Sequence, residues 1–120
     1  MKTLLLSASL LLLPMAAQAT CSLTDFSIKD FKTAARTTGT GTQLSLSGEL
    51  VNNCSEPAAA QITIEAKDAE GNVIQSKQGW PAGTTNIAPG EAAKFELGRR
   101  FRYQSDMSTY TASIVAVRAW

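Results

Sequence analysis

The sequence predicts an all-β domain of antiparallel strands, on three observations. Apolar and polar residues alternate with a period of two in several runs, which is typical of strands with one buried face. Residues that favour tight turns separate these runs. No run beyond the N-terminal 19 residues keeps the period of an amphipathic helix. Short strands joined by turns at this spacing predict an antiparallel sandwich or a small barrel.

The alternation identifies the individual strands. It is clearest over residues 44–50, 62–67, 93–97 and 110–117. The last of these runs becomes apolar on both faces towards its end, which predicts a central strand. In an earlier segment, Phe26 and Ile28 are in phase whereas Phe31 is out of phase. We therefore expect a β-bulge or a strand end near Phe31.

Turn chemistry separates the strands. Residues 68–72 lie between two strand-like runs, and Gly71 can supply the positive φ of a tight hairpin. Residues 52–57 and 88–91 contain the asparagine, proline and glycine typical of turns. Residues 37–42 consist only of threonine and glycine, and we expect them to form a loop.

Residues 1–19 have the pattern of a cleavable secretory signal. A basic start is followed by a short apolar run, and residues 17–19 (Ala-Gln-Ala) fit cleavage before Thr20. A membrane-spanning helix needs roughly 20 apolar residues, so the apolar run is too short to be an anchor. The sequence therefore predicts one β-sandwich domain over residues 20–120, located in the periplasm or outside the cell.

The charge of the exported chain limits its partners. Removal of Lys2 with the signal leaves ten basic and ten acidic residues. A neutral chain has no bulk attraction for nucleic acid or for an anionic membrane surface. No later segment is long and apolar enough for a transmembrane helix. We expect neither a nucleic-acid partner nor a transmembrane segment.

The two cysteines, Cys21 and Cys54, predict a disulfide, because an even cysteine count in an exported domain is typical of one. Closing a loop of this length removes about 3–4 kcal/mol of conformational entropy from the unfolded chain. A redox or metal-binding pair is the first alternative, but the chain has neither a C-x-x-C motif nor a histidine. Lipidation of Cys21 is the second alternative, although Thr20 is not the small residue that a lipoprotein signal places before its cysteine.

Three segments in order carry a resemblance to a known family. They are residues 48–53 (Gly-Glu-Leu-Val-Asn-Asn), residues 68–74 (Asp-Ala-Glu-Gly-Asn-Val-Ile) and residues 87–97, from Ile-Ala-Pro-Gly-Glu to Phe-Glu-Leu. Over residues 44–97 the chain resembles the FxLYD domain of exported prokaryotic proteins. Residues 64–68 read Ile-Glu-Ala-Lys-Asp where that family has Phe-x-Leu-Tyr-Asp, so Asp68 alone matches. The resemblance implies an immunoglobulin-like antiparallel β-sandwich of about seven strands, and it implies no catalytic activity.

The sequence does not favour an enzyme. Without histidine, the commonest general base and every Ser-His-Asp or Cys-His arrangement are absent. Ser76 and Lys77 are neighbours in a strand and so point to opposite faces. Asp68, Glu70 and Asn72 have the spacing of a calcium loop, but the closing glutamate is missing. We expect no cofactor and no metal.

The segment Gly-Arg-Arg-Phe-Arg-Tyr at residues 98–103 is the most distinctive candidate for a binding site. Arginine forks bind carboxylates and phosphates, and arginine and tyrosine are enriched at binding hot spots. A tryptophan in a proline- and glycine-rich loop offers a second contact. The predicted contact residues are Arg99, Arg100, Arg102, Tyr103 and Trp80. The alternative is a strand or connection whose aromatic residues lie in the core and whose arginines are solvated.

Together these features predict an exported, non-catalytic interaction module of the bacterial envelope. The expected partner is another protein or an anionic glycan that carries acidic groups. Two other functions stay open. One is a periplasmic inhibitor or immunity protein against a toxin or an envelope enzyme. The other is a pilus or surface-fibre subunit, which would need an incomplete sandwich that a donated strand completes.

Overall fold

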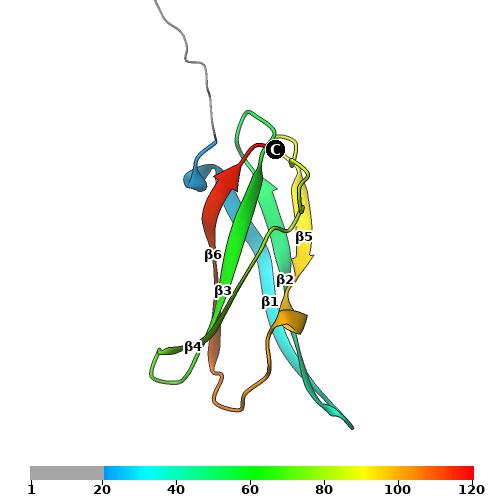
Figure 1. The fold of residues 1–120 in the computed structure, drawn as a ribbon, viewed down its shortest axis with the longest axis vertical. Coiled ribbons are helices and arrows are strands. Elements are labelled where there is room, and N and C mark those ends of the chain that lie inside the picture. Colours follow the sequence, from blue (N-terminus) through cyan, green and yellow to red (C-terminus); the bar gives the residue numbers. More distant parts are fainter. Residues whose placement is uncertain (1–20) are drawn as a thin grey trace, which may run out of the picture.

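The computed structural model describes residues 21–120, which form two three-stranded antiparallel sheets (Figure 1). The strands are β1 (Phe26–Thr38), β2 (Gly41–Asn52), β3 (Ala59–Lys67), β4 (Val73–Gly79), β5 (Ala92–Glu96) and β6 (Thr109–Arg118). One sheet has the order β1-β2-β5 and the other the order β4-β3-β6. Two single 3-10 turns, η2 (Leu23–Asp25) and η3 (Gly98–Arg100), precede β1 and follow β5. Within the described residues, no helix is long and apolar enough to cross a membrane.

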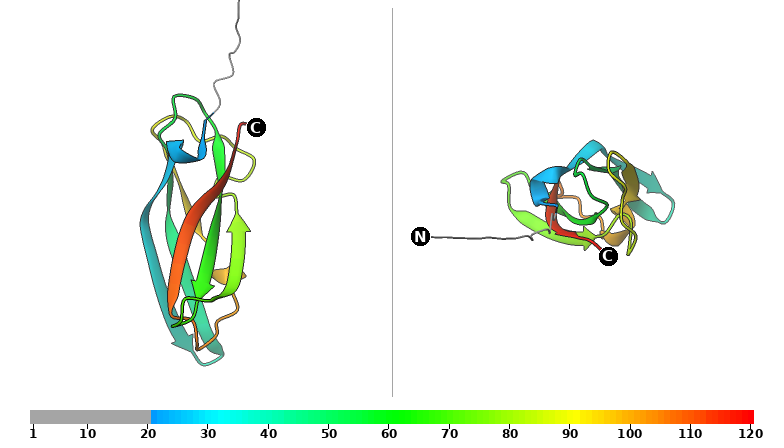
Figure 2. Two further views of the ribbon diagram at one scale, coloured as in Figure 1. Left: turned by 90° about the vertical axis from the view of Figure 1, so that its left-hand side faces the viewer. Right: turned by 90° about the horizontal axis from the view of Figure 1, so that it is seen from above.

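The core lies between the two sheets, which face each other in Figure 2. Leu46 and Leu50 of β2 and Ile62 and Ile64 of β3 are fully buried there. Burying each such side chain contributes about 1.5–3 kcal/mol. β2 and β3 are the central strands of their sheets, so their alternating apolar residues form the middle of the core. The predicted all-β fold is therefore confirmed.

Two predicted local features are also confirmed. The pairing of β1 with β2 shifts register between Lys29 and Lys32, where Asp30 has a φ of 55°. This bulge turns Phe31 towards the core, where its ring centroid lies 6.4 Å from that of Phe95. Gly71, with a φ of 87°, lies in the turn that joins β3 to β4.

The side chain of Asp68 gives a structural reason for the calcium-loop spacing of Asp68, Glu70 and Asn72 in that turn. Its Oδ1 atom accepts hydrogen bonds from the backbone amides of Glu70 (3.0 Å) and Asn72 (2.9 Å). A carboxylate that holds its own turn in this way is a common turn device. The polar residues of the segment thus stabilise the turn itself.

Two strand predictions were wrong. The strand over residues 110–117 is not central, because β6 forms the edge of its sheet and Val115 is 41% exposed. Of the predicted loop at residues 37–42, only Gly39 and Thr40 form a turn, because Thr38 pairs with Gly41 and the pairing of β1 with β2 continues to that point. Threonine is β-branched and favours extended backbone, so the threonine-rich sequence lengthens the strands.

The described residues form six strands, where the sequence predicted about seven. Residues 98–103 form no strand, since η3 is followed by a segment that side chains of β4 hold in place. Oε1 of Gln75 accepts a hydrogen bond from the Arg102 amide at 3.0 Å, and Nε2 of Gln75 donates to the Arg102 carbonyl. One glutamine side chain thereby replaces the backbone pairing of a further strand.

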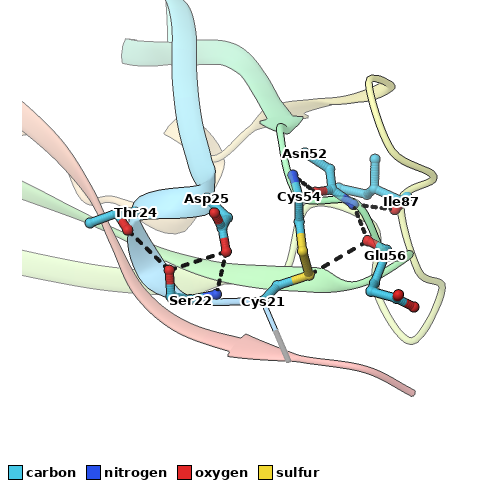
Figure 3. The surroundings of a disulfide bond; sticks show 8 residues. All are labelled: Cys21, Ser22, Thr24, Asp25, Asn52, Cys54, Glu56 and Ile87. Atoms are coloured by element: carbon cyan, nitrogen blue, oxygen red, sulfur yellow. Dashed lines mark hydrogen bonds between the residues drawn. A yellow bond between two sulfur atoms is a disulfide. The ribbon is translucent and has the colours of Figure 1, made fainter. Parts of the chain in front are cut away.

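The predicted disulfide between Cys21 and Cys54 is present, and its Cα atoms are 5.8 Å apart (Figure 3). It joins the residues before η2 to the loop after β2. The Asp25 carboxylate lies within 4.8 Å of both sulfur atoms. Because the sulfurs are bonded to each other, they are not thiolate ligands for a metal. The predicted signal segment and its cleavage site lie outside the described residues.

Candidate binding groove at the open edge of β2

The sheet that contains β2 is incomplete at one end. β5 pairs with β2 only from Ser47 to Val51. β1, in contrast, pairs with β2 as far as Gly41, so the hairpin tip extends past β5 at the lower right of Figure 1. Among the described residues, residues 41–45 of β2 therefore have a neighbouring strand on one side only. Their second edge has no neighbouring strand and is covered by Gly98 of η3 at the Leu44 carbonyl.

The end of β5 is set by the Glu96 side chain, which bends back onto β2. Its Oε2 atom accepts hydrogen bonds from the amides of Leu46 (3.1 Å) and Gly98 (2.7 Å). Its Oε1 atom accepts a hydrogen bond from the Ser45 hydroxyl at 2.8 Å. The amide of Leu97 donates to the carbonyl of Leu46 at 3.0 Å, and the chain then leaves the sheet. A carboxylate thus replaces the next carbonyl of the ladder.

The pKa of Glu96 is held below its usual value. Burial alone would raise this pKa, but the hydrogen bonds from Leu46, Ser45 and Gly98 and the nearby charge of Arg99 outweigh burial. Hydrogen bonds from donors favour the ionised form of a carboxyl group. Glu96 is therefore a carboxylate at neutral pH, with both oxygens engaged.

Gly98 lets η3 pack directly onto the backbone of β2. A Cβ atom on Gly98 would lie 2.1 Å from the carbonyl oxygen of Leu44 and 2.6 Å from its carbonyl carbon. Any larger residue would push the turn away from the strand, because these distances are far inside van der Waals contact. This close approach forms one end of the groove.

A groove of about 670 Å³ continues from this point along the open edge. Its lining residues are Thr42, Gln43, Leu44, Glu96, Gly98, Arg99 and Phe101. The side chains of Leu44 and Phe101 are buried, whereas Arg99 is exposed. Both oxygens of the Glu96 carboxylate already accept hydrogen bonds from the protein, whereas the exposed Arg99 guanidinium can donate hydrogen bonds to a ligand.

The structure gives the predicted arginines different environments. Arg99 lines the groove. Nη1 of Arg100 donates to the Gln78 carbonyl at 2.6 Å and so fastens η3 to β4 of the other sheet. The Arg102 side chain is exposed outside the groove lining. Residues 99–103 are thus a connection between the sheets with one arginine in the groove.

The alternative interpretation of this segment, a strand or connection with its aromatic residues in the core, is correct for one of the two aromatic residues. Phe101 is buried against the core, as a structural connection would require. Tyr103 was expected in the core under that alternative, but it is exposed. The backbone of the segment turns at η3 and is then held by Gln75, so Phe101 and Tyr103 have different surroundings.

Trp80 belongs to a separate cluster that does not line the groove. Its ring lies 5.5 Å from that of Trp120 in an edge-to-face arrangement. The guanidinium of Arg118 lies 4.3 Å from the centre of the Trp120 ring. Oδ1 of Asn86 accepts a hydrogen bond from the Trp120 amide at 2.9 Å. This cluster fixes the end of the chain beyond β6 against the loop after β4.

Three groove residues, Gly98, Arg99 and Phe101, lie in the predicted segment 98–103, but only Arg99 is among the predicted contact residues. The alternation over residues 93–97 predicts only that Glu96 lies on the polar face of a strand, and the prediction of a loop over residues 37–42 gives no role to Thr42. The Glu96 contact joins residues 50 positions apart, so no local pattern marks it. Gly98 directly after a strand was the one local signal, since glycine there allows close approach of two backbones.

Comparison of the chain with protein-family models, with curated proteins and with solved structures gives no match.

Proposed function

We propose that the protein is an exported, non-catalytic interaction module of the bacterial envelope that binds another protein at this groove. The open edge of β2 beside Arg99 carries the proposal. Natural sheets usually cover exposed strand edges or place charges on them, because an open edge pairs readily with other chains. Here an uncharged edge, residues 41–45, borders a groove that has one exposed arginine.

The disulfide supports the proposed location in the periplasm or outside the cell. Bonds such as Cys21–Cys54 form and persist in oxidising compartments. The signal-like residues 1–19 are consistent with the same route. The two packed antiparallel sheets also support the immunoglobulin-like architecture that the resemblance to the FxLYD domain implies.

The groove chemistry favours binding over catalysis. Its ionisable lining residues are Glu96 and Arg99. Both oxygens of Glu96 accept hydrogen bonds from the protein, so this carboxylate is poorly placed to take a proton from a ligand. An arginine side chain has five hydrogen-bond donors and no acceptor, so it is not a general base. An exposed arginine beside a strand edge is suited to recognition of a carboxylate on a partner.

The burial of the core does not favour the alternative of a pilus or surface-fibre subunit. A subunit that awaits a donated strand leaves part of its core uncovered. Leu46, Leu50, Ile62 and Ile64 are instead fully buried by the protein itself. An inhibitor or immunity protein would use the same groove for one specific partner, so it is a special case of the proposed function.

Capture of partners from envelope extract tests the proposal when matched variants are compared. The bait is the exported protein, and the variants are Arg99→Ala and Arg102→Ala. Both remove an exposed arginine, but only Arg99 lines the groove. We expect Arg99→Ala to lose the partner that the wild type and Arg102→Ala retain. Equal recovery by all three proteins would contradict the assignment of the groove.

A further inference from the structure

We propose that the occupant of the groove is an extended, acidic peptide strand of another protein, which adds to the sheet beside residues 41–45 of β2. This inference rests on the proposed function and specifies its partner. The strand would occupy the position that β5 leaves free. It would hydrogen-bond to the backbone of Thr42 and Leu44 and place a carboxylate near Arg99.

The backbone groups of Leu46 show which way the amides and carbonyls of Leu44 and Thr42 point. The Leu46 carbonyl accepts from the Leu97 amide, and its own amide donates to a carboxylate oxygen on that same side. In an antiparallel strand, this direction repeats at every second residue. Leu44 and Thr42 therefore point the same way. The Leu44 carbonyl agrees, because it lies against Gly98.

Three backbone groups consequently face the groove. They are the amide of Leu44 and the amide and carbonyl of Thr42. Within residues 21–120, no strand pairs with β2 on this side of residues 41–45. Five strand residues span about 17 Å, and Gly98 covers the Leu44 carbonyl within this span, so the edge has room for at most about five peptide residues. Main-chain hydrogen bonds supply affinity in this mode of recognition.

The outer edge of β1, on the other side of the β1–β2 hairpin, differs from the open edge of β2 in its charge. β1 is the edge strand there, and its basic residues are Lys29, Lys32 and Arg36. Such charges discourage pairing with another strand, and antiparallel pairing of two β1 strands would bring basic residues together. The five residues at 41–45 of β2 (Gly-Thr-Gln-Leu-Ser) carry no charge. Of the two edges of this hairpin, that of β2 lacks this protection.

Charge complementarity defines the chemistry of the peptide. The acidic residue of the groove, Glu96, is occupied by three hydrogen bonds from the protein. Arg99 is exposed and lines the groove, whereas Arg100 and Arg102 do not line it. An acidic side chain on the added strand would pair with the Arg99 guanidinium. A basic peptide of the same length would meet like charge.

Selection from a displayed library of random seven-residue peptides tests this inference, because it needs no knowledge of the natural partner. The bait is the exported, disulfide-bonded protein. We expect enrichment of peptides with at least one acidic residue among β-branched or aromatic residues, and without a central proline. A selection that yields no binder, or binders without acidic residues, would overturn the inference.

The selected peptide that binds most tightly is then synthesised and used to locate the binding site. We expect slower exchange of the Thr42 and Leu44 amides in its presence, by about tenfold or more. We expect Arg99→Ala to weaken binding about threefold to tenfold, whereas Arg102→Ala leaves it unchanged. N-methylation of the peptide backbone should abolish binding, because it removes the donors that the strand edge needs. Binding that survives N-methylation, or protection of other amides, would contradict strand addition.

The outcomes separate this inference from the proposed function. If Arg99→Ala abolishes partner capture but the peptides do not protect Thr42 and Leu44, strand addition is wrong and the groove assignment stands. If capture does not depend on Arg99, the proposed function fails. The protein alone could also protect these amides by self-association, which analytical ultracentrifugation would detect as a concentration-dependent dimer. In that case the occupant of the edge is a second copy of the chain, and the inference of a peptide from another protein is wrong.

Discussion

The two ends of β2 differ in how completely the protein uses them. At the Asn52 end, the strand has neighbours on both sides and leads directly to the disulfide. At the Gly41 end, one edge is open beside a groove. One strand therefore combines a closed end, which stabilises the domain, with an open end, which is available to a partner. Substitutions at the closed end should change stability alone, whereas substitutions at the open end should also change binding.

The largest stability effect is expected at the closed end, from the double variant Cys21→Ser/Cys54→Ser. The disulfide closes a loop with a sequence separation of 33 residues. Its loss should lower the free energy of unfolding by about 3–4 kcal/mol, because the unfolded chain gains conformational entropy. Urea denaturation measures this change, and reduction of the wild type should reproduce it. An unchanged midpoint would show that the disulfide does not constrain this end.

Asn52→Ala should have the next largest effect. The Asn52 side chain is fully buried, and its Nδ2 atom donates to the carbonyls of Glu56 (3.0 Å) and Ile87 (2.7 Å). Its Oδ1 atom accepts from the Cys54 amide at 2.7 Å. Removing the amide group takes these partners from the Glu56 carbonyl and the Cys54 amide and leaves the Ile87 carbonyl with the Ala58 amide alone, so we expect a loss of about 2–3 kcal/mol in denaturation experiments.

Asn53→Ala is the matched control for that variant. Asn53 is exposed, and its side chain makes one hydrogen bond, from Nδ2 to the Ser27 hydroxyl at 3.1 Å. We expect a change below about 0.5 kcal/mol. Equal effects of the two substitutions would contradict the role assigned to Asn52.

The closed end was easier to predict from the sequence than the open end. The even cysteine count predicted the disulfide, and the alternation of apolar and polar residues predicted β2. Both signals can be read from residue types and from local periodicity. The role of Glu96 could not be predicted, since its hydrogen-bond donor Leu46 lies 50 residues away. Periodicity also shows which face of a strand is buried, but not which strands flank it. For that reason β6 was mistaken for a central strand.

At the open end, Gly98→Ala tests the contact that forms the end of the groove. The added Cβ would lie 2.1 Å from the Leu44 carbonyl oxygen, so η3 must move away from β2. We expect a loss of about 1–3 kcal/mol in thermal or chemical denaturation, together with weaker partner binding. Gly39→Ala is the control, because a Cβ there would meet nothing within 4 Å. Similar losses for both variants would argue against the close approach.

Glu96→Gln should give the smallest loss, about 1 kcal/mol near neutral pH, from weaker hydrogen bonds to the Leu46 and Gly98 amides. Because the folded pKa of Glu96 lies below its ordinary value of 4.5, its contribution is present above about pH 4.5. The contribution is lost as the pH falls through the folded pKa. The stability difference between wild type and variant should therefore shrink in acid.

Glu70→Gln serves as the control for the pH series. Glu70 is exposed in the turn between β3 and β4, so Glu70→Gln makes the same change of charge away from the contacts of Glu96. Denaturation midpoints measured from pH 7 to pH 3 give the comparison. A difference between wild type and Glu96→Gln that stays constant down to pH 3 would show that the carboxylate does not act through its charge.

The most direct test of the open edge is amide hydrogen exchange along β2 in the free protein. The amides of Gln43 and Ser45 face β1, whereas those of Thr42 and Leu44 face the groove. We expect slow exchange at Gln43 and Ser45 and fast exchange at Thr42 and Leu44, an alternation that only a strand paired on one side produces. Uniform protection of all four amides would show that this edge is covered, and it would contradict the proposed binding site.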